Sequence, residues 1–261
     1  MIKPVFIEAR DLDDAWFQVL YSIFTHGRKY KIDSGSYEGS YRYSLDFVSG
    51  FIRYPHQERL APFIPENCPL PPPTTDKKIK EYFAEYILDS NLSKDEDYRY
   101  SLWIVGGEYE IPPINKKYIR STVDQPKYKV TIPNQLSWVI DHFNNKGLYN
   151  EHCYITIGYP ESNFAYDIPY SNPNERRTSP CLRGLDFRVI NDDGKNYLLL
   201  HVIYRSWDAV GGFPVNMGAF TLLNQIVALQ IKVEPGPLAF SCKSLHAYDF
   251  HYDYIKARLN R

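Results

Sequence analysis

The sequence predicts one domain of mixed α/β type. Segments with apolar residues at helical spacing are interspersed with segments of alternating or β-branched residues. No Gly/Ser linker, low-complexity tract or charge block divides the 261 residues into two parts. The order of helical and strand-like segments is mixed and does not follow a repeating βαβ series. We therefore expect a single domain that covers residues 1–261.

Three helices are predicted in the first 150 residues. Residues 11–26 carry apolar side chains at helical spacing after an acidic start, and Gly27 is placed to end the helix. A second helix follows the capping residues 74–76 and has one apolar face over 79–87. A third is indicated by the apolar residues of 136–147.

Strands are predicted between and after these helices. Residues 41–54 are rich in Tyr, Phe, Val and Ile and are interpreted as one strand, followed by a proline-rich extended connection over 55–73. Residues 151–158 indicate a further strand. The clearest hairpin is 185–204, because Asn-Asp-Asp-Gly at 191–194 supplies turn chemistry between two apolar runs.

The last 50 residues begin with a helix and end with a helix. Gly211, Gly212 and Pro214 interrupt the strand pattern before an apolar helix predicted over 217–231, which we expect to end at Pro235–Pro237. A strand over 238–245 and a short C-terminal helix complete the prediction.

Charge and composition exclude several classes of protein. The formal net charge of −1 gives no basic excess of the kind that DNA-binding proteins carry. No segment is apolar enough to span a bilayer, and the N-terminus has no signal-peptide pattern, so a cytoplasmic protein without a membrane partner is expected. The four cysteines are widely and irregularly spaced, which indicates neither a disulfide framework nor a zinc site, and no metal is expected.

Three ordered motifs indicate chemistry at Cys181, although a single cysteine is more often a small buried hydrophobe. Ser-Pro-Cys-Leu at 179–182 is followed, 24 positions after the cysteine, by Arg-Ser-Trp-Asp-Ala-Val-Gly-Gly-Phe-Pro-Val-Asn at 205–216. Leu-His-Ala-Tyr at 245–248 comes next. This set resembles the thymidylate synthase family, with its P-C, R-S-x-D-x-x-x-G-x-P-x-N and H-x-Y patterns. Residues 73–78 look like the family's T-T-K segment.

The residue types also fit the chemistry of a pyrimidine ring, whose carbon 5 becomes nucleophilic once a thiolate adds at carbon 6. Arg205 would favour the thiolate of Cys181 and, with Ser206, bind a phosphate. The carboxamide of Asn216 can donate and accept, which matches a uracil edge, whereas a cytosine edge asks for a carboxylate. A helix N-cap is the alternative role for Asn216.

The resemblance implies further roles and a quaternary structure. Glu85 is expected to be the general acid/base, with Glu81 one turn away as the alternative. His246 and Tyr248 would hold the sugar hydroxyl. The expected co-substrate is 5,10-methylene-tetrahydrofolate, with contacts expected at Asp208 and Gly212. Trp103 and Trp207 are possible walls for its ring. Asp208 is also expected to be catalytic, and Gly212 to contact the nucleotide as well.

The family fold is a mixed, twisted sheet with helices on one face and a second subunit on the other, so a homodimer is expected. The sequence departs from the family where two adjacent arginines would reach the phosphate across the dimer, because residues 150–153 read Asn-Glu-His-Cys. Arg42 is the expected replacement, with Arg176 and Arg177 as weaker alternatives. Leu182 stands where a histidine is usual. These departures look like a divergent archaeal branch of the family.

The expected activity is reductive methylation of deoxyuridine monophosphate (dUMP) to thymidine monophosphate. Two alternatives remain open at this point. A 5-hydroxymethylase acting on dUMP, dCMP or CMP would use the same cysteine adduct and let water complete the reaction. A non-catalytic dimer that binds a nucleotide or RNA would keep the pocket and lose the reactivity of Cys181.

Overall fold

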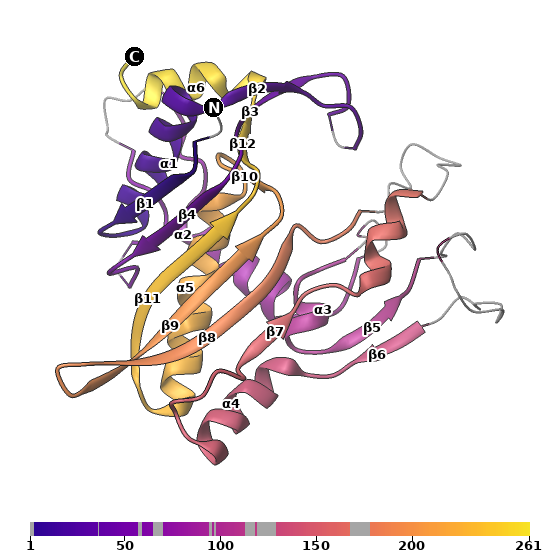
Figure 1. Cartoon of the computed structure of the whole chain (residues 1–261), viewed down its shortest axis with the longest axis vertical. Helices are drawn as coiled ribbons and strands as arrows, with labels where there is room; N and C mark the ends of the chain where they lie inside the picture. Colours follow the sequence, from indigo (N-terminus) through magenta and orange to yellow (C-terminus); the bar gives the residue numbers. More distant parts are fainter. Residues whose placement is uncertain are drawn as a thin grey trace.

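The centre of the molecule is a six-stranded mixed sheet with the strand order β1-β4-β11-β9-β8-β7 (Figure 1). The computed structural model describes residues 3–35, 37–56, 59–64, 70–93, 96, 98–112, 118, 129–167 and 178–261. β1 is parallel to β4 and β11 to β9, while the other neighbours are antiparallel. The strands are β1 (Val5–Ala9), β4 (Val48–Ile52), β7 (Tyr154–Thr156), β8 (Leu182–Asp192), β9 (Lys195–Tyr204) and β11 (Glu234–Cys242). The mixed α/β class is confirmed.

Two smaller sheets flank the large one. The four-stranded sheet has the order β10-β12-β3-β2, and the two-stranded sheet pairs β5 with β6. In the four-stranded sheet, Asp208 lies opposite His246, and Arg42 opposite Tyr248. This register brings together four residues that the motifs single out. The strands are β2 (Arg28–Lys31), β3 (Tyr41–Leu45), β5 (Gly107–Glu110), β6 (Lys129–Ile132), β10 (Trp207–Asp208) and β12 (Leu245–Tyr248).

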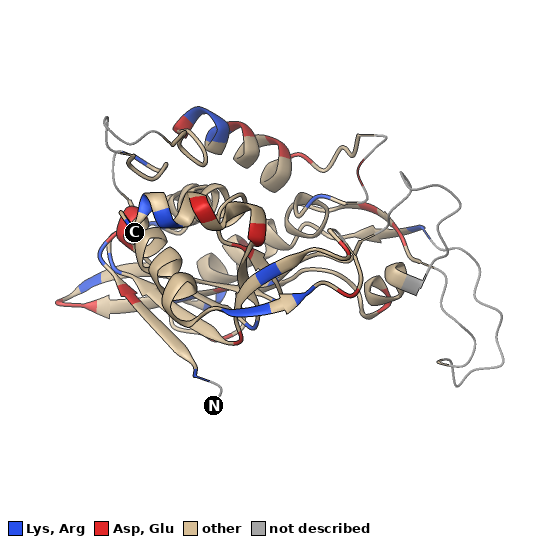
Figure 2. Ribbon diagram, turned by 90° about the horizontal axis from the view of Figure 1, so that it is seen from above, with Lys and Arg blue, Asp and Glu red and all other residues tan. Residues whose placement is uncertain are grey.

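One face of the large sheet carries the helices (Figures 1 and 2). α5 is apolar on nearly all sides and packs on β9 and β11, while α1, α2 and α4 pack against α5. No described helix is long and apolar enough to cross a membrane. The helices are α1 (Leu12–His26), α2 (Asp76–Tyr82), the π-helix η1 (Phe83–Leu88), α3 (Ser101–Ile104), α4 (Gln135–Lys146), the 3-10 helix η3 (Pro160–Asp167), α5 (Phe213–Ile231), the 3-10 helix η4 (Asp249–His251) and α6 (Tyr252–Arg258).

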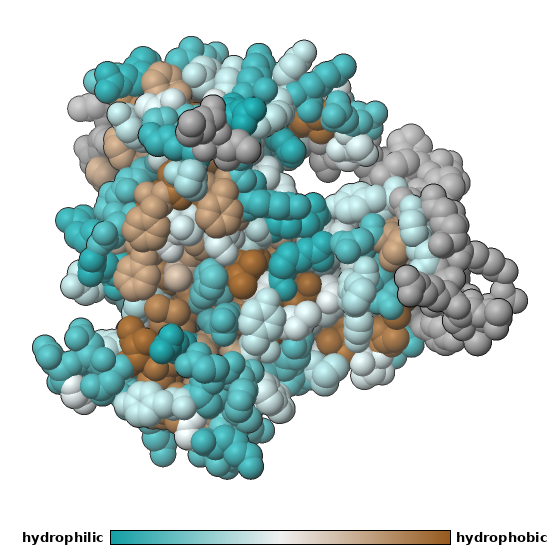
Figure 3. Space-filling model, viewed as in Figure 1, coloured by the Kyte–Doolittle hydropathy of each residue, from teal (hydrophilic) through white to brown (hydrophobic). Residues whose placement is uncertain are grey.

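The opposite face of the large sheet is apolar and has no covering layer in the described chain. Side chains that alternate with the core positions, among them Phe51, Leu199, Ile203 and Ala239, are half-buried, and Phe6 is 67% exposed. Figure 3 shows apolar residues gathered on this side. Such a face in an otherwise polar surface is typical of a protein interface.

Helix caps and turn chemistry explain why several predictions from the sequence are confirmed. The Asp11 carboxylate accepts from the Asp14 backbone N–H at 3.0 Å at the start of α1. The Thr75 hydroxyl accepts from the backbone N–H of Lys78 at 3.2 Å at the start of α2. Asp193 and Gly194 have positive φ angles and form the two-residue turn of the β8–β9 hairpin.

Two predicted boundaries are wrong. Residues 41–54 form two strands, because the chain leaves the four-stranded sheet after β3 and enters the large sheet as β4. Between them, Asp46 accepts hydrogen bonds from Arg28 and Tyr30. Pro235–Pro237 do not end a helix but lie inside β11, at a shift in its register with β9. β4 pairs with β11 only from Leu238 on, so the prolines leave no gap in that ladder.

Candidate active site

Cys181 lies immediately before β8, beside the end of β9. The backbone N–H of Arg205 donates to the carbonyl oxygen of Cys181 at 2.9 Å, which extends the β8–β9 pairing by one step. The first and second motifs are therefore adjacent in space although 24 residues separate them in sequence. The Cys181 side chain is half-buried.

The guanidinium of Arg205 wraps around the segment that carries the cysteine. Its Nε donates to the carbonyl of Pro180 at 3.0 Å and its Nη2 to the carbonyl of Ser179 at 2.8 Å. Nη2 also donates to the hydroxyl of Tyr166, whose ring lies under the guanidinium. Arg205 therefore fixes the backbone of the nucleophile segment and holds a positive charge close to the thiol.

The pKa of the Cys181 thiol reflects two opposing effects. Burial raises the pKa above the ordinary value for cysteine, and the nearby guanidinium groups of Arg205 and Arg183 lower it. The Tyr98 hydroxyl is hydrogen-bonded to the Cys181 backbone. Burial protects the thiol from solvent, while the two arginines preserve part of its acidity.

Asn216 lies one turn into α5, with its carboxamide held on both sides. The indole N–H of Trp207 donates to Oδ1 at 2.9 Å, and Nδ2 donates to the hydroxyl of Tyr82 at 2.8 Å. Each amide end retains one further hydrogen-bonding capacity. The N-cap of α5 is Gly212, so the alternative N-cap role for Asn216 is wrong.

Tyr82 and Trp207 are site residues that sequence reasoning did not assign to Asn216. Tyr82 stacks on Tyr86 with ring centroids 4.9 Å apart, and Trp207 stacks on Tyr204 at 4.0 Å. Trp207 is 2% exposed, so its ring faces the core and offers no ligand wall. The position of Trp207 inside the second motif was the only feature of the sequence that could have indicated its role at Asn216. Nothing in the local sequence distinguishes Tyr82 from a core tyrosine.

His246 has one ring nitrogen that is free to accept a hydrogen bond from a ligand. Its Nδ1 lies 3.1 Å from the carbonyl oxygen of Ser244, and because a carbonyl only accepts, Nδ1 carries the proton. The other nitrogen, Nε2, is buried without a partner, as is Nε of Arg42. Burial, and then the charge of Arg42, lower the pKa of His246, which keeps the ring neutral.

The remaining motif residues lie around this centre. Asp208 accepts from the Val210 backbone N–H at 2.9 Å through Oδ1. A Cβ on Gly211 would lie 2.9 Å from Oδ2 of Asp208, and one on Gly212 would lie 3.5 Å from Oδ1 of Asn216. The two glycines therefore leave both polar groups accessible. Ser206 is half-buried between Arg205 and Trp207.

Glu81 and Glu85, the two candidate acid/base residues, are both on the protein surface. The Glu85 side chain is exposed on η1, and the carbonyl oxygen of Glu85 accepts from Arg99 at 3.3 Å. Glu81 is exposed and its nearest cation is Lys77 at 3.7 Å. Neither side chain contacts Cys181 or Asn216 in the hydrogen bonds of the described residues.

The predicted folate contact at Trp103 does not fit its position. The ring is 2% exposed and lies among Tyr98 and Tyr109 in the hydrophobic core. A buried tryptophan with aromatic neighbours on its sides contributes to packing and leaves no face open to a ligand. Arg176 and Arg177 lie outside the described residues.

Glu96 is a carboxylate that the motifs did not indicate, and it contacts Tyr86 of η1. It accepts from Nε of Arg99 at 2.7 Å and from the Ser93 backbone N–H at 3.0 Å, and it contacts the Tyr86 hydroxyl. These hydrogen bonds outweigh burial and lower its pKa to about 2. Glu96 is therefore ionised at neutral pH. So weak a base cannot serve as a general acid/base near pH 7, and we assign Glu96 the structural role of holding this segment through its hydrogen bonds.

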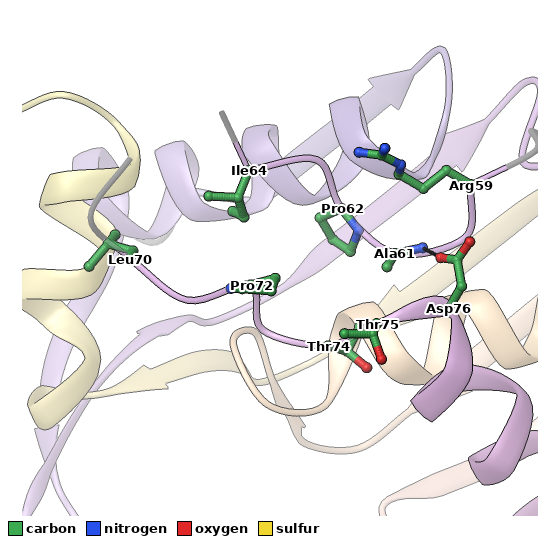
Figure 4. Close-up of a pocket in the computed structure, with 9 residues that line it drawn as sticks. All are labelled: Arg59, Ala61, Pro62, Ile64, Leu70, Pro72, Thr74, Thr75 and Asp76. Atoms are coloured by element: carbon green, nitrogen blue, oxygen red, sulfur yellow. Dashed lines mark hydrogen bonds between the residues drawn. The ribbon is translucent and has the colours of Figure 1, made fainter. Parts of the chain in front are cut away.

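An open hollow of about 440 Å³ lies at the start of α2, and Cys181 is not among the residues that line it (Figure 4). Asp76 points across it and Oδ1 accepts from the backbone N–H groups of Ala61 at 2.8 Å and Leu60 at 3.2 Å. Asp76, at the start of α2, therefore ties the proline-rich connection to this helix through two hydrogen bonds. Among the described residues, no group of three or more His, Cys, Asp or Glu side chains has a metal-binding arrangement.

Comparison with known proteins places these residues in a family. The family model described as thymidylate synthase matches residues 102–261, which is more than half of the chain. Proteins named "Putative thymidylate synthase" from Methanosarcina acetivorans and Methanocaldococcus jannaschii are 24% and 28% identical to it. The alignments cover 96% and 74% of this chain, and 92% and 72% of those proteins.

A further relative is similar over a shorter stretch but at higher sequence identity. A thymidylate synthase from Fusobacterium nucleatum is 32% identical over 88 residues, which is 34% of this chain and 30% of that protein. The archaeal relatives agree with the divergent archaeal branch that the motifs predict. The chain belongs to the thymidylate synthase family.

Proposed function

We propose that this chain is a thymidylate synthase that converts dUMP to thymidine monophosphate in the cytoplasm, with residues 1–261 acting as one catalytic domain. The observation that carries the proposal is a half-buried cysteine thiol beside Arg205, together with an Asn216 carboxamide that Trp207 and Tyr82 hold in one orientation. The Tyr82 hydroxyl links these groups, because it bonds to Asn216 and lies within electrostatic reach of Cys181.

Base recognition follows from the fixed amide of Asn216. With Oδ1 held by Trp207 and Nδ2 by Tyr82, one lone pair and one hydrogen remain for a ligand. A uracil ring offers N3–H as donor and its carbon-4 oxygen as acceptor, which complements this pair. The amide donor then supports the negative charge that builds on the carbon-4 oxygen during the reaction.

The covalent step belongs to Cys181. Its thiolate adds to carbon 6 of the ring, a C–S bond forms, and the electrons of the 5,6 double bond move toward carbon 5 and the carbon-4 oxygen. Carbon 5 is then the nucleophile that receives the one-carbon unit. Loss of the proton from carbon 5 then lets the bond between the one-carbon unit and its donor nitrogen break, and transfer of a hydride to that carbon drives release of the thiolate, which restores the 5,6 double bond.

His246 and Tyr248 are proposed to hold the sugar end of the nucleotide, and the neighbouring Arg42 is proposed to contribute a cation toward its phosphate. The unpartnered Nε2 of the neutral His246 is an acceptor suited to a sugar hydroxyl. Satisfying this buried nitrogen would remove the cost of leaving it unpaired. Arg205 and Ser206 are proposed to bind the phosphate.

The residues around Asp208 fit the folate co-substrate that the family uses. The Gly211 side opens onto Oδ2 of Asp208, an acceptor for the N–H groups of a pterin ring. When bound, methylene-tetrahydrofolate supplies the one-carbon unit and the hydride. Gly212 would allow the ring to approach Asn216, and Glu85 is proposed to move protons at the carbon-4 oxygen, since it is the accessible carboxylate one turn beyond Tyr82.

The open apolar face of the large sheet is proposed to bind a second copy of the chain (Figure 3). Residues such as Phe6, Phe51 and Ile203 would lose solvent contact in a homodimer, which is favourable at roughly 25 cal/mol per Å² of apolar surface. A symmetric dimer uses the same face on both subunits. Cross-linking and light scattering test this state directly.

The activity itself is tested by incubating the protein with dUMP and methylene-tetrahydrofolate. Dihydrofolate absorbance and the mass of the nucleotide are followed together. A methylated nucleotide with equimolar dihydrofolate supports the synthase. A hydroxymethylated nucleotide without dihydrofolate would identify the hydroxymethylase alternative, and no product from dUMP, dCMP or CMP would favour the non-catalytic alternative.

A further inference from the structure

A second arginine lies beside the nucleophile. Arg183 follows Cys181 by two residues, at a shift in the register of β8 with β9, and its guanidinium is close enough to the Cys181 thiol to lower the pKa of the thiol. Leu182, between them, is fully buried in the core. The departure from the family's histidine at position 182 therefore concerns the core side of the strand, while position 183 faces the site.

Arg183 and Arg205 converge on the same residue. Nη2 of Arg183 donates to Oγ of Ser179 at 3.2 Å, and Nη2 of Arg205 donates to the carbonyl oxygen of Ser179 at 2.8 Å. Arg183 Nη2 also donates to Oδ1 of Asn163 at 2.7 Å. The two guanidinium groups are therefore neighbours on one side of the Cys181 segment.

Among the described residues, every hydrogen-bond acceptor of these two arginines is neutral. The ion pairs of the described residues include neither Arg183 nor Arg205, whereas Arg99 and Arg188 have carboxylate partners. Burial, and then the charge of Arg205, lower the pKa of Arg183, which shows that the two cations oppose each other. Two adjacent guanidinium groups without a carboxylate are a typical site for an anion.

We propose that Arg183 and Arg205 of the same subunit form the site for the 5′-phosphate of the pyrimidine nucleotide. Arg183 would supply the charge that is missing at residues 150–153, where the family places its arginine pair. This inference rests on the proposed function, because it names the phosphate site next to Cys181. A phosphate dianion would neutralise both cations and accept hydrogen bonds from both planar guanidinium groups.

The placement suits a nucleotide attached to Cys181. In the anti conformation of a pyrimidine nucleotide, carbon 6 of the ring faces the 5′-phosphate. A thiol that attacks carbon 6 therefore needs its anion site close by. Arg183 is two residues from Cys181 and, like Arg205, lies within electrostatic reach of its thiol.

The test compares the binding of dUMP with that of deoxyuridine, which lacks the phosphate. Arg183→Ala should weaken dUMP binding by roughly tenfold to a hundredfold and change deoxyuridine binding less than about twofold. Arg183→Lys should give an intermediate loss, because the charge remains without the planar fork. The control is Arg188→Ala, since Arg188 lies on the same strand, is exposed and faces Glu151 at 3.8 Å. Equal losses for nucleotide and nucleoside, or no loss for dUMP, would overturn the proposal.

A second measurement needs neither nucleotide binding nor turnover. Iodoacetamide alkylates Cys181, and inorganic phosphate in the arginine pair should slow this reaction by removing the charges that favour the thiolate. The slowing should be present in the wild-type protein and in Arg188→Ala and should be lost in Arg183→Ala. If phosphate slows all three proteins equally, or none, the anion site is wrong. If it behaves as expected while no pyrimidine nucleotide binds, the proposed function fails and the anion site stands.

Discussion

The indole N–H of Trp207 donates a hydrogen bond to Oδ1 of Asn216 at 2.9 Å, and this contact fixes which way the carboxamide faces. A free carboxamide could turn over and exchange its donor for its acceptor. With the oxygen held by Trp207, the nitrogen must face Tyr82, and the ligand always meets the same pattern. We interpret Trp207 as a positioning residue for base recognition.

Trp207→Phe should impair the enzyme through Asn216. The phenyl ring keeps the stacking on Tyr204 but removes the N–H, which costs about 1 kcal/mol of hydrogen bonding and frees the amide. We expect a roughly tenfold fall in kcat/KM for dUMP and a reduced preference for uracil over cytosine nucleotides. Steady-state kinetics with both nucleotides measure this, and Trp138→Phe is the control because Trp138 is exposed. An unchanged kcat/KM would show that Trp207 does not position the amide.

Asn216→Asp should change the nucleotide preference of the site. A carboxylate retains the acceptor for Trp207 but removes the N–H donor, so it repels the carbon-4 oxygen of uracil and accepts from the amino group of cytosine. We expect binding of dUMP to weaken and binding of dCMP to strengthen, each by roughly tenfold or more. Titration calorimetry with the two nucleotides gives the ratio. Parallel losses for both nucleotides would mean that Asn216 does not face the base.

Glu96→Gln should destabilise the protein in a pH-dependent way. The folded-state pKa of Glu96 is lowered to about 2, so the contribution of its charge is present above the unfolded pKa near 4.3 and is lost as the pH falls toward 2. At pH 7 we expect a loss of about 1 to 2 kcal/mol in the free energy of unfolding.

Urea denaturation of the wild type and Glu96→Gln across pH 2.5–7 measures this difference. The two proteins should converge at the acidic end, because the wild-type carboxylate gains a proton on unfolding there. The control is Glu108→Gln, since Glu108 is exposed and lies 3.7 Å from exposed Lys129. A difference that stays constant with pH would mean that the charge of Glu96 is not what stabilises this segment.

Alkylation of Cys181 should accelerate with pH through pH 9, because burial holds its pKa above the ordinary thiol value. Arg205→Leu removes the cation that lowers the pKa most and should slow alkylation at pH 8 by severalfold. Cys153 and Cys242 are internal controls, since burial raises their pKa values to about 11 and about 12. Peptide mass spectrometry after timed iodoacetamide labelling resolves the three sites. A rate at Cys181 that does not change with pH would contradict this assignment of its protonation state.

The sequence was informative where local chemistry decides the structure. Capping at Asp11 and Thr75 and the Asp193–Gly194 turn depend on neighbouring residues alone, and these elements were predicted correctly. The division of residues 41–54 between two sheets depends on which distant strands receive them. That information lies in β11 and β12, so a periodic pattern could not show it.

The same distinction applies to the site. Cys181, Arg205, Asn216 and His246 were predicted because their spacing matches a known pattern. Tyr82 could not be assigned, because its hydroxyl meets Asn216 across 134 residues of sequence. Arg183 was missed although it lies two positions from the nucleophile, since its meaning comes from Arg205 and from the neutral character of its partners.

The measurement that tests the central claim most directly is the mass of the intact protein after incubation with 5-fluorodeoxyuridine monophosphate and methylene-tetrahydrofolate. Fluorine at carbon 5 cannot leave as a cation, so the reaction stops while the nucleotide is still bound through carbon 6. We predict a denaturation-resistant mass increase that includes the nucleotide, located on Cys181 by peptide mapping and absent in Cys181→Ala. A wild-type protein that binds the nucleotide without any covalent mass increase would contradict the assignment of Cys181 as the nucleophile.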